Sequence, residues 1–138
     1  METLLSSDSR HLAGILFLAL VTVETGGLYL LKVVRGRQDV TAFQEKFARA
    51  GHAHAGVLLV LALVCQPFVD ATTLSGGWAW VARSGVAAAA LLMPGGFFFS
   101  SMGRGRTRPN SLIVLLWAGA LFLAAGVLTL GILVLAAA

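Results

Sequence analysis

The chain has 138 residues, of which 58% are hydrophobic and only 12% are charged, and its mean hydropathy is +0.88. These values lie well outside the range of soluble domains of this length, so the sequence predicts a membrane protein without a soluble domain. The net charge of +4 is explained by basic loops beside a membrane, and no nucleic-acid-binding motif accompanies it. A single cysteine, Cys65, excludes an intramolecular disulfide and a cysteine-based zinc site.

Four apolar stretches are each close to the roughly 20 residues that a helix needs to cross about 30 Å of hydrocarbon. They cover residues 12–34, 52–69, 78–100 and 111–136. Little sequence lies outside them, so residues 1–138 are expected to form a single transmembrane domain. The predicted fold class is all-α, an integral membrane four-helix bundle.

The basic residues are unevenly distributed between the connections of this bundle. The first and third connections hold most of them: Lys32, Arg35, Arg37, Lys46, Arg49, Arg104, Arg106 and Arg108. The other side carries only Arg10 and Arg83. The positive-inside rule therefore places the basic loops in the cytoplasm and both termini outside, in an inner (plasma) membrane of bacterial type.

Glu24 lies near the middle of the first span, where a carboxylate costs about 2.5–3.5 kcal/mol on insertion scales. Such a residue is a candidate for a functional role, here as an acid in a pocket. The alternative is a protonated side chain that hydrogen-bonds to a neighbouring helix. In an antiparallel hairpin Glu24 would lie about 10 Å deeper than the histidines of the second span. Direct contact with His52 is therefore not expected within one chain, although contact across a subunit boundary is possible.

The second span opens with "RAGHAHAGVLLVL" (residues 49–61), which places two imidazoles two positions apart. Residues two apart on a helix point about 200° away from each other, so His52 and His54 are not expected to bind one metal ion together. Phe47 and Leu58 fall nearer the face of His54. We therefore expect the two histidines to face different helices or subunits.

Arg49 and Gly56 share the face of His52, because they lie three residues before it and four after it. A basic side chain beside an imidazole, with a small residue one turn deeper, suits a haem. The histidine would bind the iron, and the arginine would bind a propionate. The alternative is a histidine that only forms hydrogen bonds near the membrane interface.

Pro94 and the two glycines after it should kink or loosen the third helix. Three aromatic residues, Phe97, Phe98 and Phe99, follow at once. This combination predicts a pocket lined by rings, which would suit an apolar ligand or a flat cofactor. The alternative is a bent helix with an aromatic belt at the membrane interface.

Two further features are expected to serve packing. Arg83, near the outer end of the third span, should either snorkel to the interface or pair with Asp70. Small residues at four-residue spacing, such as Gly85 and Ala89, allow helix backbones to approach closely in lipid. Both features indicate a tightly packed bundle, and neither indicates a particular reaction or ligand.

Three segments together are similar to one known family. The first is "LAGILFLALVTVETGGLYL" (12–30), with an Ala-Gly, an apolar stretch with Thr and a glycine-rich end. The second is "FARAGHAHAG" (47–56), similar to an aromatic-Ala-Arg-Ala-His-x-Gly motif that begins a second helix. The third comprises "GGFFFSS" and "PNSL", similar to a Gly-Phe-Tyr segment and a later Pro-Asn. On these segments, which are spread over nearly the whole length of the sequence, the chain resembles the styrene oxide isomerase family. Those small four-span membrane proteins are distantly similar in architecture to membrane-associated eicosanoid and glutathione metabolism proteins.

This resemblance implies a homotrimer with haem b between its subunits, held by a histidine of the second-helix motif. It also implies a ferric iron that acts as a Lewis acid on a small apolar epoxide, which isomerises to an aldehyde by ring opening and a hydride shift. His52 is the expected iron ligand, since it shares a face with Arg49, and Gly56 completes the cofactor site. His54 is the alternative ligand. Gly51 is an additional residue between the Arg-Ala of the motif and His52, whereas His54, Ala55 and Gly56 match its His-x-Gly part.

The chain departs from the family pattern at the positions expected to orient the epoxide. The family's asparagine is replaced by Ala55 or an aliphatic residue, and its pocket tyrosine falls near Phe98. Glu24, which has no counterpart in the family pattern, and Phe98 are the expected catalytic pocket residues. Two alternatives to an enzyme therefore remain. One is a haem-binding sensor or redox protein, and the other is a haem-free transport or structural module in which Glu24 and the histidines handle protons or a cation.

Overall fold

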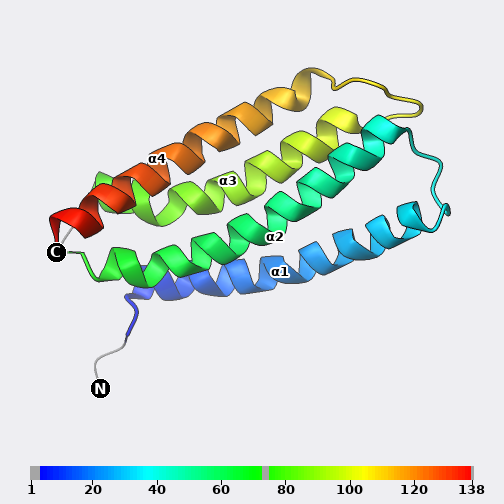
Figure 1. Cartoon of the computed structure of the whole chain (residues 1–138). Helices are drawn as coiled ribbons and strands as arrows, with labels where there is room; N and C mark the ends of the chain where they lie inside the picture. The colour runs from blue at the N-terminus through cyan, green and yellow to red at the C-terminus, as the bar shows by residue number, and fades with distance from the viewer. Residues whose placement is uncertain (1–3, 73–74, 138) are drawn as a thin grey trace.

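The structure is a computed structural model that describes residues 4–72 and 75–137. Within these residues it contains four long helices and one 3-10 turn, and no strand. The elements are α1 (Ser7–Val34), α2 (Ala42–Asp70), α3 (Gly77–Ser101), η1 (Ser111–Ile113) and α4 (Val114–Ala136) (Figure 1). Four helical segments, the last running from Ser111 to Ala136, are long and apolar enough to cross a membrane. The predicted all-α bundle with four candidate spans is confirmed.

The first two helices begin earlier than the apolar stretches that predicted them. α1 begins after Ser6, whose hydroxyl accepts a hydrogen bond from the Ser9 amide at 3.2 Å. α2 begins ten residues before the predicted span, because Thr41 and Gln44 form a capping box that satisfies its first amides. His52 consequently lies nearly three turns inside α2 and not at its mouth.

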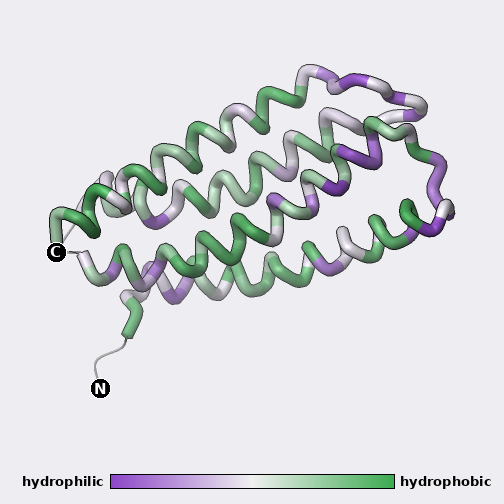
Figure 2. Tube along the Cα trace, in the orientation of Figure 1, coloured by the Kyte–Doolittle hydropathy of each residue, from purple (hydrophilic) through white to green (hydrophobic). Residues whose placement is uncertain are grey.

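Both basic connections lie at one end of the bundle. Figure 1 shows that residues 35–41 and residues 102–110 lie at one end and that the start of α1 and the end of α4 lie at the other. We call the first of these the basic end. Figure 2 shows hydrophilic residues gathered there, while hydrophobic residues dominate along the helices. The prediction that the two basic connections share one side of the molecule is confirmed.

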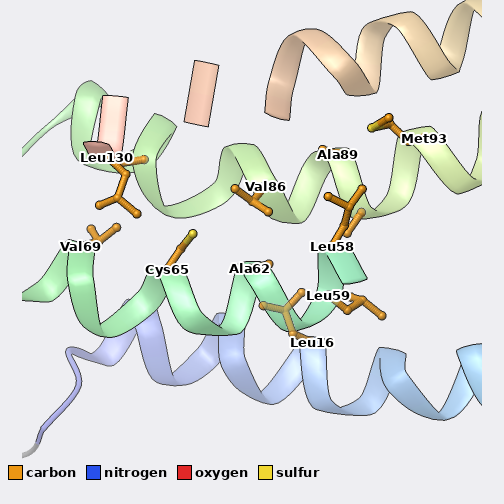
Figure 3. Packing of buried hydrophobic residues seen from close by; sticks show 12 residues of the cluster. Leu16, Leu58, Leu59, Ala62, Cys65, Val69, Val86, Ala89, Met93 and Leu130 are labelled. Carbon is orange, nitrogen blue, oxygen red and sulfur yellow. The ribbon is translucent and has the colours of Figure 1, made fainter. Parts of the chain in front are cut away.

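The helices are arranged in sequence, with α2 and α3 at the centre, α1 packed on α2, and α4 packed on α3. The core between them is built from small and branched side chains of all four helices (Figure 3). Its members include Leu16, Leu58, Leu59, Ala62, Cys65, Val69, Val86, Ala89, Met93 and Leu130. α1 contributes only Leu16 to this buried set. Most of α1 is therefore held to the bundle on one side only.

α3 and α4 touch through their backbones. A Cβ atom added to Gly85 would lie 2.7 Å from the Gly126 Cα, and one added to Gly96 would meet the backbone of Leu116. Glycine is required at such positions because no side chain atom fits between the helices. α3 continues through Pro94 to Ser101 without interruption.

A polar cluster ties three helices together at the end opposite the basic end. The Arg83 guanidinium lies 3.0 Å from the Asp70 carboxylate and also donates a hydrogen bond to Ser9. Asp70 accepts a hydrogen bond from the Ser6 amide at 2.8 Å, and the buried Gln66 donates to the Arg83 carbonyl at 3.1 Å. The predicted pairing of Arg83 with Asp70 is confirmed, and it fixes the start of α1 against α2 and α3. We call these five residues the terminal polar cluster.

Asn110 closes the connection between α3 and α4. Its side chain donates a hydrogen bond to the Phe99 carbonyl at 3.0 Å and accepts one from the Leu112 amide at 2.8 Å. Its own amide donates to the Ser100 carbonyl at 2.9 Å. The "PNSL" segment thus caps η1 and returns the chain directly to the end of α3.

Candidate functional site

A groove lies between α1 and α3, because both helices pack on α2. α2 forms its floor, and its volume is about 460 Å³, within the range of sites for small ligands. Its walls are almost entirely apolar. They comprise α1 side chains between residues 12 and 26, Ala55 and Leu59 of α2, and α3 side chains between residues 87 and 99.

The rim of this groove is formed by apolar side chains that point out of the bundle. Ile15, Leu91 and Phe99 line the groove and are 63%, 76% and 46% exposed. These side chains lie within the candidate membrane spans, where acyl chains would surround them. The groove therefore opens sideways toward hydrocarbon.

The half-buried His52 lines the groove, and its ring lies in a seat formed by two glycines of α1. A Cβ atom on Gly26 would lie 3.3 Å from the ring Nδ1, and one on Gly27 would lie 3.4 Å from Cε1. The glycine pair thus leaves the space that the imidazole occupies between α1 and α2. Thr22 also lines the groove, but its hydroxyl donates to the Ala19 carbonyl at 2.6 Å. Within residues 4–72 and 75–137 the His52 ring forms no hydrogen bond. A Cβ atom on Gly27 would also lie 3.6 Å from Nε2, so both ring nitrogens face the glycine pair of α1.

His54 lies on the other side of α2. Its Nδ1 is 2.8 Å from the Ala50 carbonyl oxygen, and its ring packs on Phe97 with the centroids 5.0 Å apart. A carbonyl oxygen can only accept, so Nδ1 carries a proton and the neutral ring leaves Nε2 as an acceptor. Phe47 packs on the same Phe97 ring at 5.4 Å. The prediction that His52 and His54 face different helices is confirmed.

The other expected site residues divide into two groups. Phe98 lines the groove with His52, and Gly56 lines a second hollow with His52 beside Val23. Arg49 lies outside both: its Nη2 is 2.6 Å from Glu45 Oε1, and its side chain is 57% exposed. The structure therefore places Phe98 and Gly56 in two different hollows that share His52, and it leaves Arg49 toward the basic end.

Glu24 is exposed on α1 and does not line the groove. Its carboxylate has no hydrogen bond or ion pair among the residues that the structure describes. Glu24 lies ten residues before the end of α1, and His52 lies ten residues after the start of α2. The two residues are thus at a similar level, and the expected difference of about 10 Å in depth is wrong because α2 begins at Ala42.

Reasoning from the sequence missed three glycines as parts of the site. Gly26 and Gly27 suggest close packing, but nothing in the sequence says that the side chain seated on them is a histidine. Gly51 looks like an inserted residue, yet a Cβ atom there would lie 3.0 Å from the Phe98 ring and 3.1 Å from the Phe97 Cβ. Gly51 therefore lets α2 touch α3 at the level of the histidines.

No family model, no curated protein and no solved structure matches this chain. Among the described residues, no three His, Cys, Asp or Glu side chains gather into a metal-binding group. A haem needs no such cluster, since the porphyrin supplies the other nitrogen ligands and the protein supplies an axial imidazole. The candidate site is thus an apolar groove, open to the bilayer, with one imidazole in its wall.

Proposed function

We propose that this chain is a haem-b-dependent isomerase that converts a small apolar epoxide to an aldehyde, as its resemblance to the styrene oxide isomerase family implies. In this proposal it lies in an inner membrane of bacterial type as a homotrimer, with the basic end in the cytoplasm and both termini outside. The observation that supports it most is the His52 imidazole, which has no hydrogen-bond partner in the described chain and lines the apolar groove.

The residues present fit a haem by the chemistry of their donor atoms. To hold the iron, the His52 ring would turn from the Gly26–Gly27 seat toward the groove. Arg49, one turn nearer the basic end and mostly exposed, would bind a propionate in place of Glu45. When bound, a ferric haem with an open coordination position supplies a Lewis acid for the epoxide oxygen.

The apolar groove suits the proposed reaction in two ways. Epoxide and aldehyde contain the same atoms, because one C–O bond breaks and one hydride moves to the adjacent carbon, so no co-substrate is needed. Apolar walls exclude the water that would otherwise add to the opened epoxide. The Phe98 ring, which lines the groove, would stabilise positive charge on the reacting carbon if it presents its face.

The choice between the two histidines rests on where each one faces. His54 has the fixed Nδ1 and the free Nε2 that are typical of metal-bound histidines, but it packs on Phe97, away from the groove. His52 faces the groove, so we assign the iron to His52. Absorption spectra of His52→Ala and His54→Ala, purified from haem-sufficient cells, test this assignment. We expect His52→Ala alone to lose the Soret band. Loss in His54→Ala alone would move the iron to His54, and colourless wild-type protein would refute the proposal.

A second candidate function is a haem-binding membrane protein without this catalysis. Ala55 and Phe98 both line the groove, and neither offers the hydrogen bond expected from an asparagine or a tyrosine to the epoxide. Incubation of the haem-loaded protein with an aryl epoxide separates the two functions. The isomerase must release an aldehyde, and His52→Ala must not. Haem-loaded protein that leaves the epoxide unchanged would favour the sensor or redox function.

A further inference from the structure

The outward face of α1 carries a regular apolar stripe interrupted by one carboxylate. Phe17, Val21, Leu28 and Leu31 are 61%, 58%, 63% and 43% exposed, and Glu24 stands in the middle of the stripe. The successive spacings are four, three, four and three residues, which is the pattern of a helix seam that packs against another helix. In the described chain nothing covers this seam. A carboxylate there would face hydrocarbon unless a polar partner meets it.

A second stripe with the same spacing runs along α2, with two members exposed and three half-buried. Ala50, His54, Val57, Leu61 and Val64 follow one another at intervals of four, three, four and three residues. Val57 and Val64 are 67% and 48% exposed, and His54 lies beside a shallow hollow that includes Val57. Because Nδ1 of His54 is engaged by the Ala50 carbonyl, Nε2 is the atom available to a partner.

Glu24 and His54 also match in depth. Glu24 lies ten residues before the basic end of α1, and His54 lies twelve residues after the basic end of α2. At 1.5 Å per residue this is a difference of about 3 Å. The two side chains do not meet within one chain, since His54 packs toward α3 and Glu24 points out of the bundle. Copies that share one orientation in a membrane would hold the two side chains at the same level.

We propose that α1 of one copy packs along α2 of a second copy, with the Glu24 carboxyl hydrogen-bonded to Nε2 of His54 in that second copy. A protonated Glu24 would donate to Nε2, and transfer of this proton would give an ion pair, so both groups are satisfied in either state. The contact is heterologous, because different surfaces of the two copies meet. Repetition of such a contact gives a closed ring when the rotation between copies divides a full turn. The contact does not require the iron of the proposed function.

Disulfide trapping in native membranes tests this contact. In a Cys65→Ala background, oxidation of the chain with both Glu24→Cys and His54→Cys should give covalent dimers and larger species. Chains with either cysteine alone should give none, because a heterologous contact does not bring like positions together. A pair of Thr25→Cys with His54→Cys is the matched control, since Thr25 has a similar depth and lies 100° around α1. Absence of cross-links from the first pair, or equal cross-linking by the control pair, would overturn the proposal.

A second measurement uses chains without introduced cysteines, so its result does not depend on whether the cysteine variants fold. Native mass spectrometry in detergent should find an oligomer for the wild type and for Glu24→Gln, whose amide still donates to Nε2. Glu24→Met, which has a similar size and no hydrogen-bond donor, should give less oligomer, with unchanged helix content by circular dichroism. A monomeric wild type, or an equal amount of oligomer in Glu24→Met, would refute the pairing whether or not the protein binds haem.

Discussion

α1 and α3 are both apolar membrane-length helices, but they occupy opposite positions in the bundle. α3 buries twelve residues between two neighbours, whereas α1 buries three. Gly85 and Gly96 of α3 meet backbone atoms of α4, and two glycines of α1 meet the side chain of His52. The same residue type therefore serves backbone packing in one helix and seats a histidine side chain in the other. α3 is enclosed by its neighbours, whereas α1 leaves most of its surface exposed.

Loss of the carboxylate in the terminal polar cluster should have the largest effect, because this cluster is the firmest attachment of α1. We expect Asp70→Ala to lower the free energy of unfolding by about 3–5 kcal/mol, since the Arg83 charge stays buried without its partner. The Ser6 amide also loses its acceptor. Unfolding in mixed detergent micelles would measure the change. Asp39→Ala, at an exposed carboxylate near the basic end, should change stability by less than about 0.5 kcal/mol. Equal losses in both variants would contradict this role of the cluster.

The same glycine-to-alanine substitution should have different effects in the two helices. Gly85→Ala in α3 places a methyl group 2.7 Å from the Gly126 Cα, and this overpacking should cost about 1–3 kcal/mol. Gly14→Ala in α1 meets no atom within 4 Å, so it should be neutral or slightly stabilising. The comparison uses the same unfolding measurement. A loss in Gly14→Ala as large as that in Gly85→Ala would mean that α1 is packed as closely as α3.

Substitution in the seat of His52 should affect the site more than the fold. Gly26→Ala would place a methyl group 3.3 Å from Nδ1, so the ring must move. We expect a stability change below about 1 kcal/mol and a weaker or shifted Soret band per mole of purified protein. Gly131→Ala in α4, where no atom lies within 4 Å, is the control and should leave the spectrum unchanged. An unaltered spectrum in Gly26→Ala would argue against a haem at His52.

The sequence was sufficient for the parts of the molecule that follow from local rules. Hydropathy alone predicts four spanning helices, and the 100° turn per residue predicts that His52 and His54 face different neighbours. The start of α2 was predicted too late because its first turns are polar, although Thr41 and Gln44 carry a recognisable capping signature. The groove and the glycine seat depend on how α1 and α3 lie on α2. Residues that are distant in the chain form both features, and no local pattern encodes that arrangement.

Because the groove opens sideways, a low affinity for an apolar ligand is enough to fill it. An apolar molecule partitions into the bilayer and is far more concentrated there than in water. A groove reached from the lipid phase can therefore be occupied by weak contacts alone, and rapid departure of the product into the same phase follows from that weakness. At a constant total amount of ligand, the fraction of grooves that are occupied will then vary with the lipid-to-protein ratio, because the ligand exchanges with the bilayer.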